Sequence, residues 1–352
     1  MGVLFYSYKK VLKILYQSLR KVRLVRLLYS HIKKNEFFKI WILNILKKII
    51  NFNNIFMPIL RKFEYLEIIY LDQYNIAGTL NFNPKPEFGD PKAYPNFQKE
   101  LELFKNHLCK LVAEEKSKTF YKFGDGDYYF LKKQEYGSAA PGKRALSKSY
   151  EEINHQEFVE GVLFNDYILA EIDYGNRRRF NEIYPKRQID YPAEFCYGLV
   201  ANKWLFNTFN GKIGLIGAKE KIELIEKLMK YEEYKNYLGI DKFNDYIYIP
   251  QKFACDNVNS VEEMVSKQLL NSDSNIFLMG IGHVKSALLH RLKKYKNAIY
   301  LDVGSGIDAI AGIINIRRPY MGNWINFRLK RYNYSNIDDL KYNKKGKHVM
   351  LN

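Results

Sequence analysis

The chain has 352 residues, 47% of them hydrophobic and 16% aromatic, which is enough for one large domain or two small ones with a real core. Residues 1–62 carry 14 Lys/Arg against one acidic residue and residues 328–352 carry seven against two, while the 35 basic and 35 acidic residues between them cancel. A neutral body without a recognised nucleic-acid module argues against nucleic-acid binding and favours basic ends that contact an anionic surface. The three cysteines form no CxxC pair and therefore offer neither a disulfide framework nor a zinc knuckle.

Residues 1–75 are predicted to form a basic amphipathic helical segment. Apolar residues recur at helical spacing between Val11 and Leu28 with Lys and Arg between them, and neither this stretch nor residues 37–50 has the ~20 uncharged residues that a spanning helix needs. Such a helix suits the headgroup region of an anionic membrane, and the alternative is a helical hairpin that packs on the body or on a partner. Because we find no secretory signal, we expect a cytoplasmic protein that is peripheral at the inner face of a membrane.

Residues 76–96 are rich in Pro, Gly and Asn and are predicted to be a linker. The following stretch, residues 97–116, has one apolar face at helical spacing and is predicted to be an amphipathic helix. A short strand, Thr119–Phe123, comes next and ends at the sequence Gly-Asp-Gly-Asp, residues 124–127, which we expect to form a turn.

Strands that are almost wholly apolar alternate with helices after Gly211. We expect helices over residues 218–234, 260–270 and 283–295, the second opened by a capping box of Ser260 and Glu263. The strands are predicted near Ile213–Ile216, Tyr246–Ile249, Ile276–Met279 and Ile299–Val303. This alternation predicts an α/β fold, a Rossmann-like and mostly parallel sheet with helices on both faces, over residues 97–327, followed by a basic tail over residues 328–352.

The centre of the chain is less regular. Residues 151–172 are predicted to be helical, and residues 173–192 to be a loop or a broken helix that carries candidate substrate contacts.

Asp125 and Asp127 are the strongest candidates for chemistry. Two carboxylates one residue apart at the carboxyl end of a strand can reach one divalent ion, and oxygen ligands suit Mg²⁺ or Mn²⁺. Gly124 and Gly126 would let the backbone approach a sugar or a diphosphate. The alternative is a solvated turn, since Asp and Gly are common in turns.

Two later glycine turns also border the expected carboxyl edge of the sheet. The turn from Gly280 to His283 precedes a helix whose first N–H groups favour a phosphate, although the P-loop pattern is absent. Asp302 begins a D-x-G-x-G stretch that resembles the first motif of class I methyltransferases. In those enzymes this strand comes first in the domain, whereas here only about 50 residues follow it, so a late strand that borders the site is the simpler interpretation.

The stretch "YKFGDGDYYFL" resembles the [RK]-F-G-D-G-E-[FL] motif of bacterial GT-D fold glycosyltransferases. Residues 276–305 resemble the end of that family's domain, a strand, a glycine turn, a helix and a strand that ends in D-[IV]-G. The order and spacing agree over residues 97–312. Asp125 matches the first acid of the motif, Asp127 stands where the family has Glu, and Lys122 stands where Arg is usual. Asp302 and Gly304 match the final D-x-G, and Ser305 stands where His is common.

The resemblance implies a glycosyltransferase that moves a sugar from a nucleoside-diphosphate donor, UDP-sugars favoured, to a glycan, lipid-linked or protein-linked acceptor. A Mn²⁺ or Mg²⁺ ion at Asp125 and Asp127 and nearby cations would neutralise the departing diphosphate. Lys143 and Arg144 are candidate cations, and the donor contacts are completed by Lys122, Gly124, Gly126, Gly280, His283 and Asp302. The candidate general bases are Asp173, Glu182 and Asp308. The alternatives are a methyltransferase and a non-catalytic protein that binds a membrane surface or nucleic acid.

Overall fold

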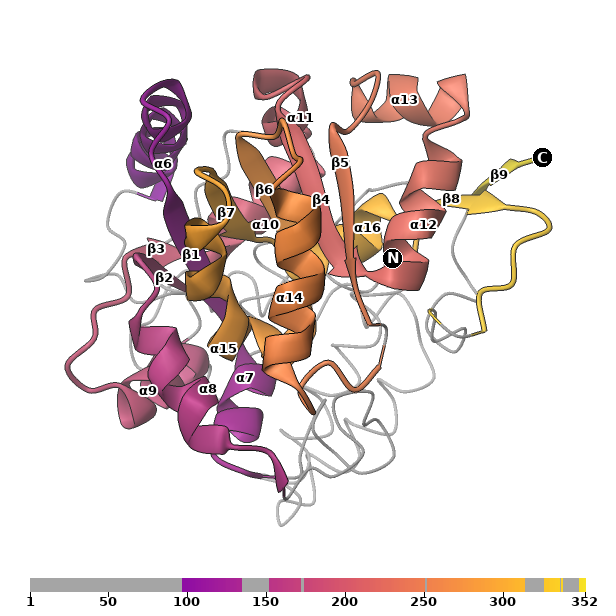
Figure 1. The fold of residues 1–352 in the computed structure, drawn as a ribbon. Helices are drawn as coiled ribbons and strands as arrows, with labels where there is room; N and C mark the ends of the chain where they lie inside the picture. The colour runs from indigo at the N-terminus through magenta and orange to yellow at the C-terminus, as the bar shows by residue number, and fades with distance from the viewer. Residues whose placement is uncertain are drawn as a thin grey trace, which may run out of the picture.

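A seven-stranded sheet in which every pair of neighbours is parallel forms the centre of the computed structural model (Figure 1). The structure describes residues 97–134, 152–171, 174–250, 252–313, 326–335, 337 and 348–352, so the predicted N-terminal segment and linker lie outside the described residues. The strand order is β3-β2-β1-β7-β6-β4-β5. The strands are β1 (Lys118–Phe123), β2 (Tyr167–Ala170), β3 (Tyr191–Pro192), β4 (Ile213–Ala218), β5 (Asp245–Ile249), β6 (Ile276–Gly280) and β7 (Ile299–Asp302). The predicted α/β fold and its five expected strands are confirmed.

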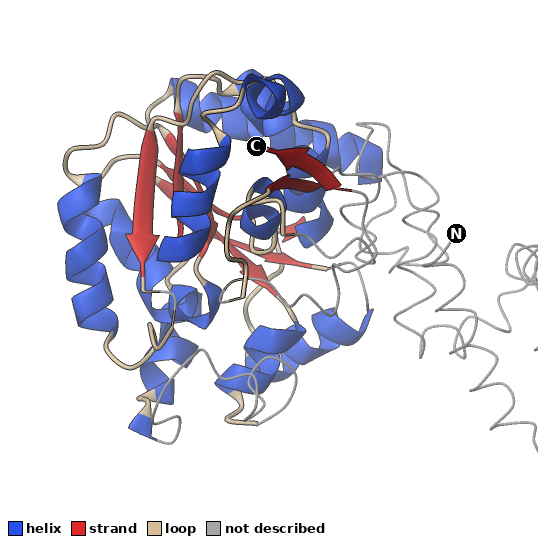
Figure 2. Cartoon of the chain, turned by 90° about the vertical axis from the view of Figure 1, so that its right-hand side faces the viewer, coloured by secondary structure: helices blue, strands red, loops and turns tan. Residues whose placement is uncertain are grey.

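Helices cover both faces of this sheet, as Figure 2 shows. The first face carries α6 (Phe97–Ala113), α10 (Ala193–Ala201), α11 (Trp204–Thr208), α12 (Lys219–Leu228), α13 (Glu232–Leu238) and α16 (Gly306–Ile310). The second face carries α7 (Asp125–Leu131), α8 (His155–Leu163), α9 (Tyr174–Ile183), α14 (Val258–Leu269), η5 (Gly282–Val284), α15 (Lys285–Leu288) and η6 (Leu289–Lys294).

Alternation along the strands divides the core between the two faces. In β1, Phe120 joins the cluster on the first face and Tyr121 and Phe123 join the cluster on the second. In β7, Leu301 lies on the first face and Tyr300 on the second. The strands are buried on both sides, which is why they read as continuous apolar runs in the sequence.

The prediction of one helix over residues 151–172 was wrong. Helix α8 ends at Leu163, where the Asn165 side-chain amide donates to the carbonyl of Gly161 (3.0 Å), and the chain then enters strand β2. The "YILA" sequence of β2 is short and apolar, so periodicity could not separate a buried strand from a helix there.

Three further helix predictions differ from the structure. The helix expected over residues 218–234 is divided into α12 and α13. Helix α14 begins at Val258, and Asn257, not Ser260, is its N-cap, because Asn257 Oδ1 accepts from Ser260 N (2.9 Å). The helix expected over residues 283–295 is divided into η5, α15 and η6.

The C-terminal residues extend the first face. A parallel pair, β8 (Asn326–Leu329) and β9 (His348–Leu351), brings Phe327 and Leu351 into the core cluster of that face. The predicted boundary between the domain and its basic tail, at residues 327 and 328, therefore falls inside β8.

Candidate functional site

The carboxyl ends of β1, β7 and β6 meet at a point where the chain leaves the sheet in different directions. Strands β1 and β6 lead to α7 and to η5 and α15 on the second face, whereas β7, which lies between them, leads to α16 on the first face. Ligands of open α/β sheets bind at such switch points. Three predicted residues at the ends of these strands, Gly124, Gly280 and Asp302, therefore lie at one edge.

Asp127 is buried in a network of donors at this edge. Its side chain is only 5% exposed, and its Oδ2 accepts from Gly124 N (2.9 Å) and pairs with Lys285 Nζ (3.1 Å). Its Oδ1 lies 3.2 Å from Nδ1 of His283, whose ring stacks on Phe130 with the centroids 4.7 Å apart. The structure thus brings two predicted residues, Asp127 and His283, into direct contact.

Lys285 joins Asp127 to the end of β7. Its Nζ lies 2.7 Å from Asp302 Oδ2 and also donates to the carbonyl of Lys122. Asp302 in turn accepts from Lys122 N (3.3 Å) and from Gly304 N (2.9 Å), so one buried lysine fixes the ends of two neighbouring strands. Sequence reasoning missed Lys285, and the available signal was a lysine two residues after His283 in an otherwise apolar stretch.

The network keeps Asp127 ionised. Burial alone would raise the pKa of its carboxyl group, but the charge of Lys285, the hydrogen bond and charge of His283 and the charge of Lys122 hold that pKa well below its usual range. The buried carboxylate and the buried ammonium of Lys285 therefore stabilise each other.

The Gly-Asp-Gly-Asp sequence is the start of a helix, and the prediction of a turn was wrong. Gly124 is the N-cap of α7, and Asp125 and Asp127 lie in its first turn. Residues two apart on a helix point in directions about 200° apart. Accordingly Asp127 is buried, whereas Asp125 is exposed and accepts from Gly126 N (2.8 Å).

This arrangement does not fit a divalent ion held directly by both aspartates. Both oxygens of Asp127 are engaged by protein donors, and Asp125 lies on another side of the helix. Within the described residues there is no group of three or more His, Cys, Asp or Glu that could hold a metal ion. The Mn²⁺ or Mg²⁺ site stays a prediction.

Lys122 is a second buried cation at the edge, on the first face. Its side chain is 8% exposed, and Nζ lies 5.2 Å from the centroid of the Tyr197 ring in α10. Apart from this ring contact, Nζ makes no hydrogen bond or ion pair with another described residue. Burial lowers the pKa of Lys122, but Tyr197 and the charges of Asp302, Glu171 and Asp127 raise it more, so that it lies well above its usual range and the side chain stays protonated.

Two glycines lie beside the Lys122 ammonium. A Cβ on Gly124 would lie 3.5 Å from Nζ, and a Cβ on Gly304, where φ is +49°, would lie 2.8 Å from Cε and 3.6 Å from Nζ. The next residue, Ser305, has a buried Oγ with no hydrogen-bond partner among the described residues. A protonated amine and a hydroxyl, neither hydrogen-bonded to another described residue, therefore flank one glycine turn.

The other predicted residues lie apart from this cluster or outside the described residues. Lys143, Arg144 and Asp173 belong to the residues that the structure does not describe. Glu182 is exposed, accepts from Tyr128 Oη (3.0 Å) and pairs with Lys132 (3.3 Å).

Asp308 and Gly280 have structural contacts. Asp308 pairs with Lys221 at 2.6 Å. A Cβ on Gly280 would lie 2.7 Å from the carbonyl oxygen of Gly304, so Gly280 allows the turns after β6 and β7 to pack together.

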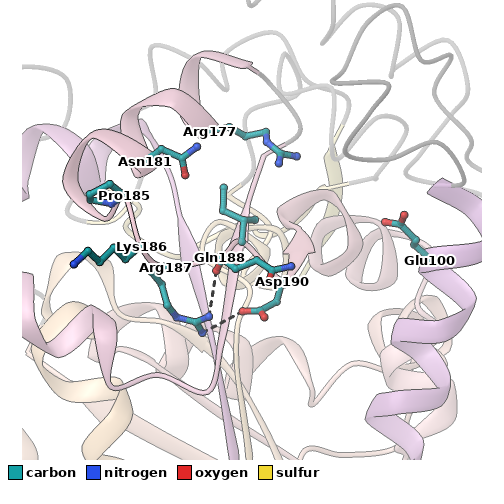
Figure 3. Close-up of a pocket in the computed structure, with 9 residues that line it drawn as sticks. Glu100, Arg177, Asn181, Pro185, Lys186, Arg187, Gln188 and Asp190 are labelled. Atoms are coloured by element: carbon teal, nitrogen blue, oxygen red, sulfur yellow. Dashed lines mark hydrogen bonds and ion pairs between the residues drawn. The ribbon is translucent and has the colours of Figure 1, made fainter.

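A cavity of about 710 Å³ lies between α6, α9 and the segment before β3 (Figure 3). Its lining is polar: Glu100, Arg177, Asn181, Pro185, Lys186, Arg187, Gln188, Ile189 and Asp190. Arg187 donates to Asp190 (3.1 Å) and to backbone carbonyls, among them that of Asp166 (2.9 Å). These contacts give Arg187 a structural role. The cavity has the volume of a small-molecule site.

Comparisons with protein-family models, with curated proteins and with solved structures find no match to this chain. No helix within the described residues is long and apolar enough to cross a membrane.

Proposed function

We propose that the protein is a glycosyltransferase that uses a nucleoside-diphosphate sugar, a UDP-sugar in the first place, and transfers the sugar to a glycan, lipid-linked or protein-linked acceptor. The observation that carries this proposal is Lys122, a buried and protonated amine with no oxygen acceptor among the described residues, located at a switch point beside two glycines. An anionic group of a ligand is the natural partner for such a cation.

The chemistry follows from the charge of the leaving group. Transfer breaks the bond between the sugar carbon and the diphosphate oxygen, and negative charge grows on the departing nucleoside diphosphate. The ammonium of Lys122 would stabilise that charge, and the hydroxyl of Ser305 would donate to a phosphate oxygen. Preorganised donors of this kind contribute strongly to catalysis in a site that excludes water.

The buried network supports this site from the second face. Lys285 pairs with both Asp127 and Asp302, and these carboxylates hold the backbone of Gly124 and Gly304 in place by accepting from their N–H groups. Because both oxygens of Asp302 are engaged by Lys285, Lys122 N and Gly304 N, they are already committed within the protein. This disfavours the methyltransferase alternative, in which the same stretch would contact the cofactor.

The test is donor binding by the full chain and by Lys122→Met, with exposed Lys267→Met as the matched control. Thermal shift and calorimetry are measured with UDP-sugars, GDP-sugars and S-adenosylmethionine, with and without Mn²⁺. We expect a nucleotide sugar to bind and Lys122→Met to weaken it by about 10- to 100-fold, the value of one charged hydrogen bond. Binding of S-adenosylmethionine alone, or binding of none of these compounds, contradicts the proposal.

We further propose that the basic residues before Phe63 hold the enzyme at the inner face of an anionic membrane. Each Lys or Arg near such a surface contributes about 1 kcal/mol, so a few engaged side chains suffice. The full chain should sediment with phosphatidylserine vesicles at low salt and be released by high salt, and removal of residues 1–62 should abolish sedimentation. Equal binding to neutral vesicles would contradict an electrostatic anchor.

A further inference from the structure

Glu171 lies beside the candidate donor site and is a carboxylate that sequence reasoning did not select. It is the first residue after β2, and the register of Phe123 with Ala170 places it next to Gly124 at the carboxyl edge. Lys122 pairs in register with Leu169, two residues before Glu171. The charge of Glu171 raises the pKa of Lys122, which agrees with this proximity.

The orientation of the Glu171 carboxylate is fixed by α9. Asn176 is buried, and its Nδ2 donates to Glu171 Oε2 at 2.6 Å. The oxygen of the same amide accepts from Arg179 Nη1 at 3.0 Å, so the amide is held with its nitrogen towards Glu171. A carboxylate positioned in this way by a buried amide is typical of a group that must meet a substrate in one geometry.

Arg177, the residue after Asn176 in α9, lines the cavity shown in Figure 3. Its volume of about 710 Å³ suits one or two sugar rings, and its polar lining suits hydroxyl groups. In the sheet, β2, which Glu171 follows, lies between β1, which carries Lys122, and β3, which the cavity-lining residues 185–190 precede.

Four other acidic residues considered from the sequence are held in ion pairs. Asp127 and Asp302 share Lys285, and Glu182 and Asp308 are paired with Lys132 and Lys221. Asp125 is exposed in the first turn of α7.

We propose that Glu171 is the general base of the reaction, an inference that rests on the proposed glycosyltransferase function. Its carboxylate takes the proton of the acceptor hydroxyl while that oxygen forms a bond to the anomeric carbon of the donor. The bond from this carbon to the diphosphate oxygen breaks, and its electron pair leaves with the nucleoside diphosphate. The proton then passes from Glu171 to solvent. Water can replace the acceptor in the same step, which gives slow hydrolysis of the donor.

The experiment measures nucleotide release from UDP-sugars and GDP-sugars by the full chain, with water as the acceptor. Glu171→Gln is the decisive variant, because glutamine keeps an oxygen that can accept from Asn176 but cannot take a proton. We expect it to lower kcat by about 100-fold or more, the range of general base catalysis, and to leave the donor Kd within about threefold of the wild-type value. Exposed Glu263→Gln on α14 is the control and should match the wild type.

The pH profile separates a base from a structural residue. The wild-type rate should fall as the pH is lowered, because the base becomes protonated, and this acidic limb should disappear in Glu171→Gln. If Glu171→Gln keeps a rate within about threefold of the wild type, or keeps the acidic limb, the inference fails while the proposed function stands. If the wild type neither binds nor turns over any nucleotide sugar, both fail.

Discussion

The two faces of the sheet differ in how they neutralise charge at the same carboxyl edge. On the second face, Asp127, His283, Lys285 and Asp302 satisfy one another through contacts of 2.7–3.2 Å. On the first face, Lys122 Nζ has no oxygen partner within the described residues.

This difference suggests that the second face supports the fold, whereas the first face binds the ligand. A fully paired buried network stabilises the native geometry and leaves little capacity to bind anything else. A buried charge without an acceptor destabilises the folded protein. Such charges persist at functional sites, where a bound ligand supplies the missing partner. Substitutions on the second face should therefore reduce stability, whereas substitutions on the first face should reduce ligand binding.

Lys285→Met should have the largest effect on stability. It leaves Asp127 and Asp302 buried without their shared cation, and the loss of one partner of a buried ion pair costs about 3–5 kcal/mol. Urea unfolding followed by circular dichroism would measure it. Lys267→Met, which removes an exposed pair with Glu263, should change the free energy of unfolding by less than about 0.5 kcal/mol. Equal stability of the two variants would show that the network does not support the fold.

Asp127→Ala should destabilise the protein by about 2–3 kcal/mol, less than Lys285→Met because Lys285 keeps Asp302. Its burial makes Asp127 part of the packed interior at this edge of the sheet. Asp125→Ala should cost less than about 1 kcal/mol, the value of an exposed acid in the first turn of a helix. Urea unfolding of Asp127→Ala and Asp125→Ala in the same buffer would measure this difference. A loss on Asp125→Ala as large as that on Asp127→Ala would contradict the structural division between them.

The contribution of Asp127 to stability should depend on pH. Its folded-state pKa lies below the unfolded value of about 3.9, so its contribution is complete above that value and is lost as the pH falls through the folded-state pKa. The difference in unfolding free energy between the wild type and Asp127→Asn should thus be constant above about pH 5 and shrink below about pH 4. Urea titrations at pH 7, 5, 4 and 3 would show this, and a constant difference would contradict it.

Gly304→Ala should have a modest effect on stability and a clear effect on binding. Its φ of +49° costs about 1–2 kcal/mol for a residue with a Cβ, and that Cβ would lie 2.8 Å from Lys122 Cε. Gly211→Ala, with φ of +72° and no neighbour within 4 Å, has the same backbone cost alone. We expect both variants to lose similar stability, and only Gly304→Ala to bind UDP-sugars more weakly in calorimetry. Unchanged affinity would place the donor elsewhere.

The sequence predicts most of the sheet because parallel strands buried on both faces leave a simple apolar signal. It also places Lys122, Gly124 and Asp302 at one edge, since the carboxyl ends of parallel strands meet there. It could not separate the roles of Asp125 and Asp127, because that depends on whether a helix or a turn follows Gly124.

Other features of the site depend on contacts between distant residues. Lys285 meets Lys122 across 163 residues, which no local pattern encodes. Glu171 follows a strand that was itself predicted to be helical, so its place at the edge could not be inferred.

The position of β7 has a consequence for how the molecule folds. This strand is the last of the sheet in sequence, yet it lies between β1 and β6, and its pairing with β1 joins residues about 180 apart. Until β7 is in place, β1 to β3 and β4 to β6 are two separate sheets with exposed edges. Contacts of such sequence separation form slowly, and incomplete sheets of this kind are prone to aggregate. Assembly of the chain and assembly of its candidate site are thus completed by the same late event.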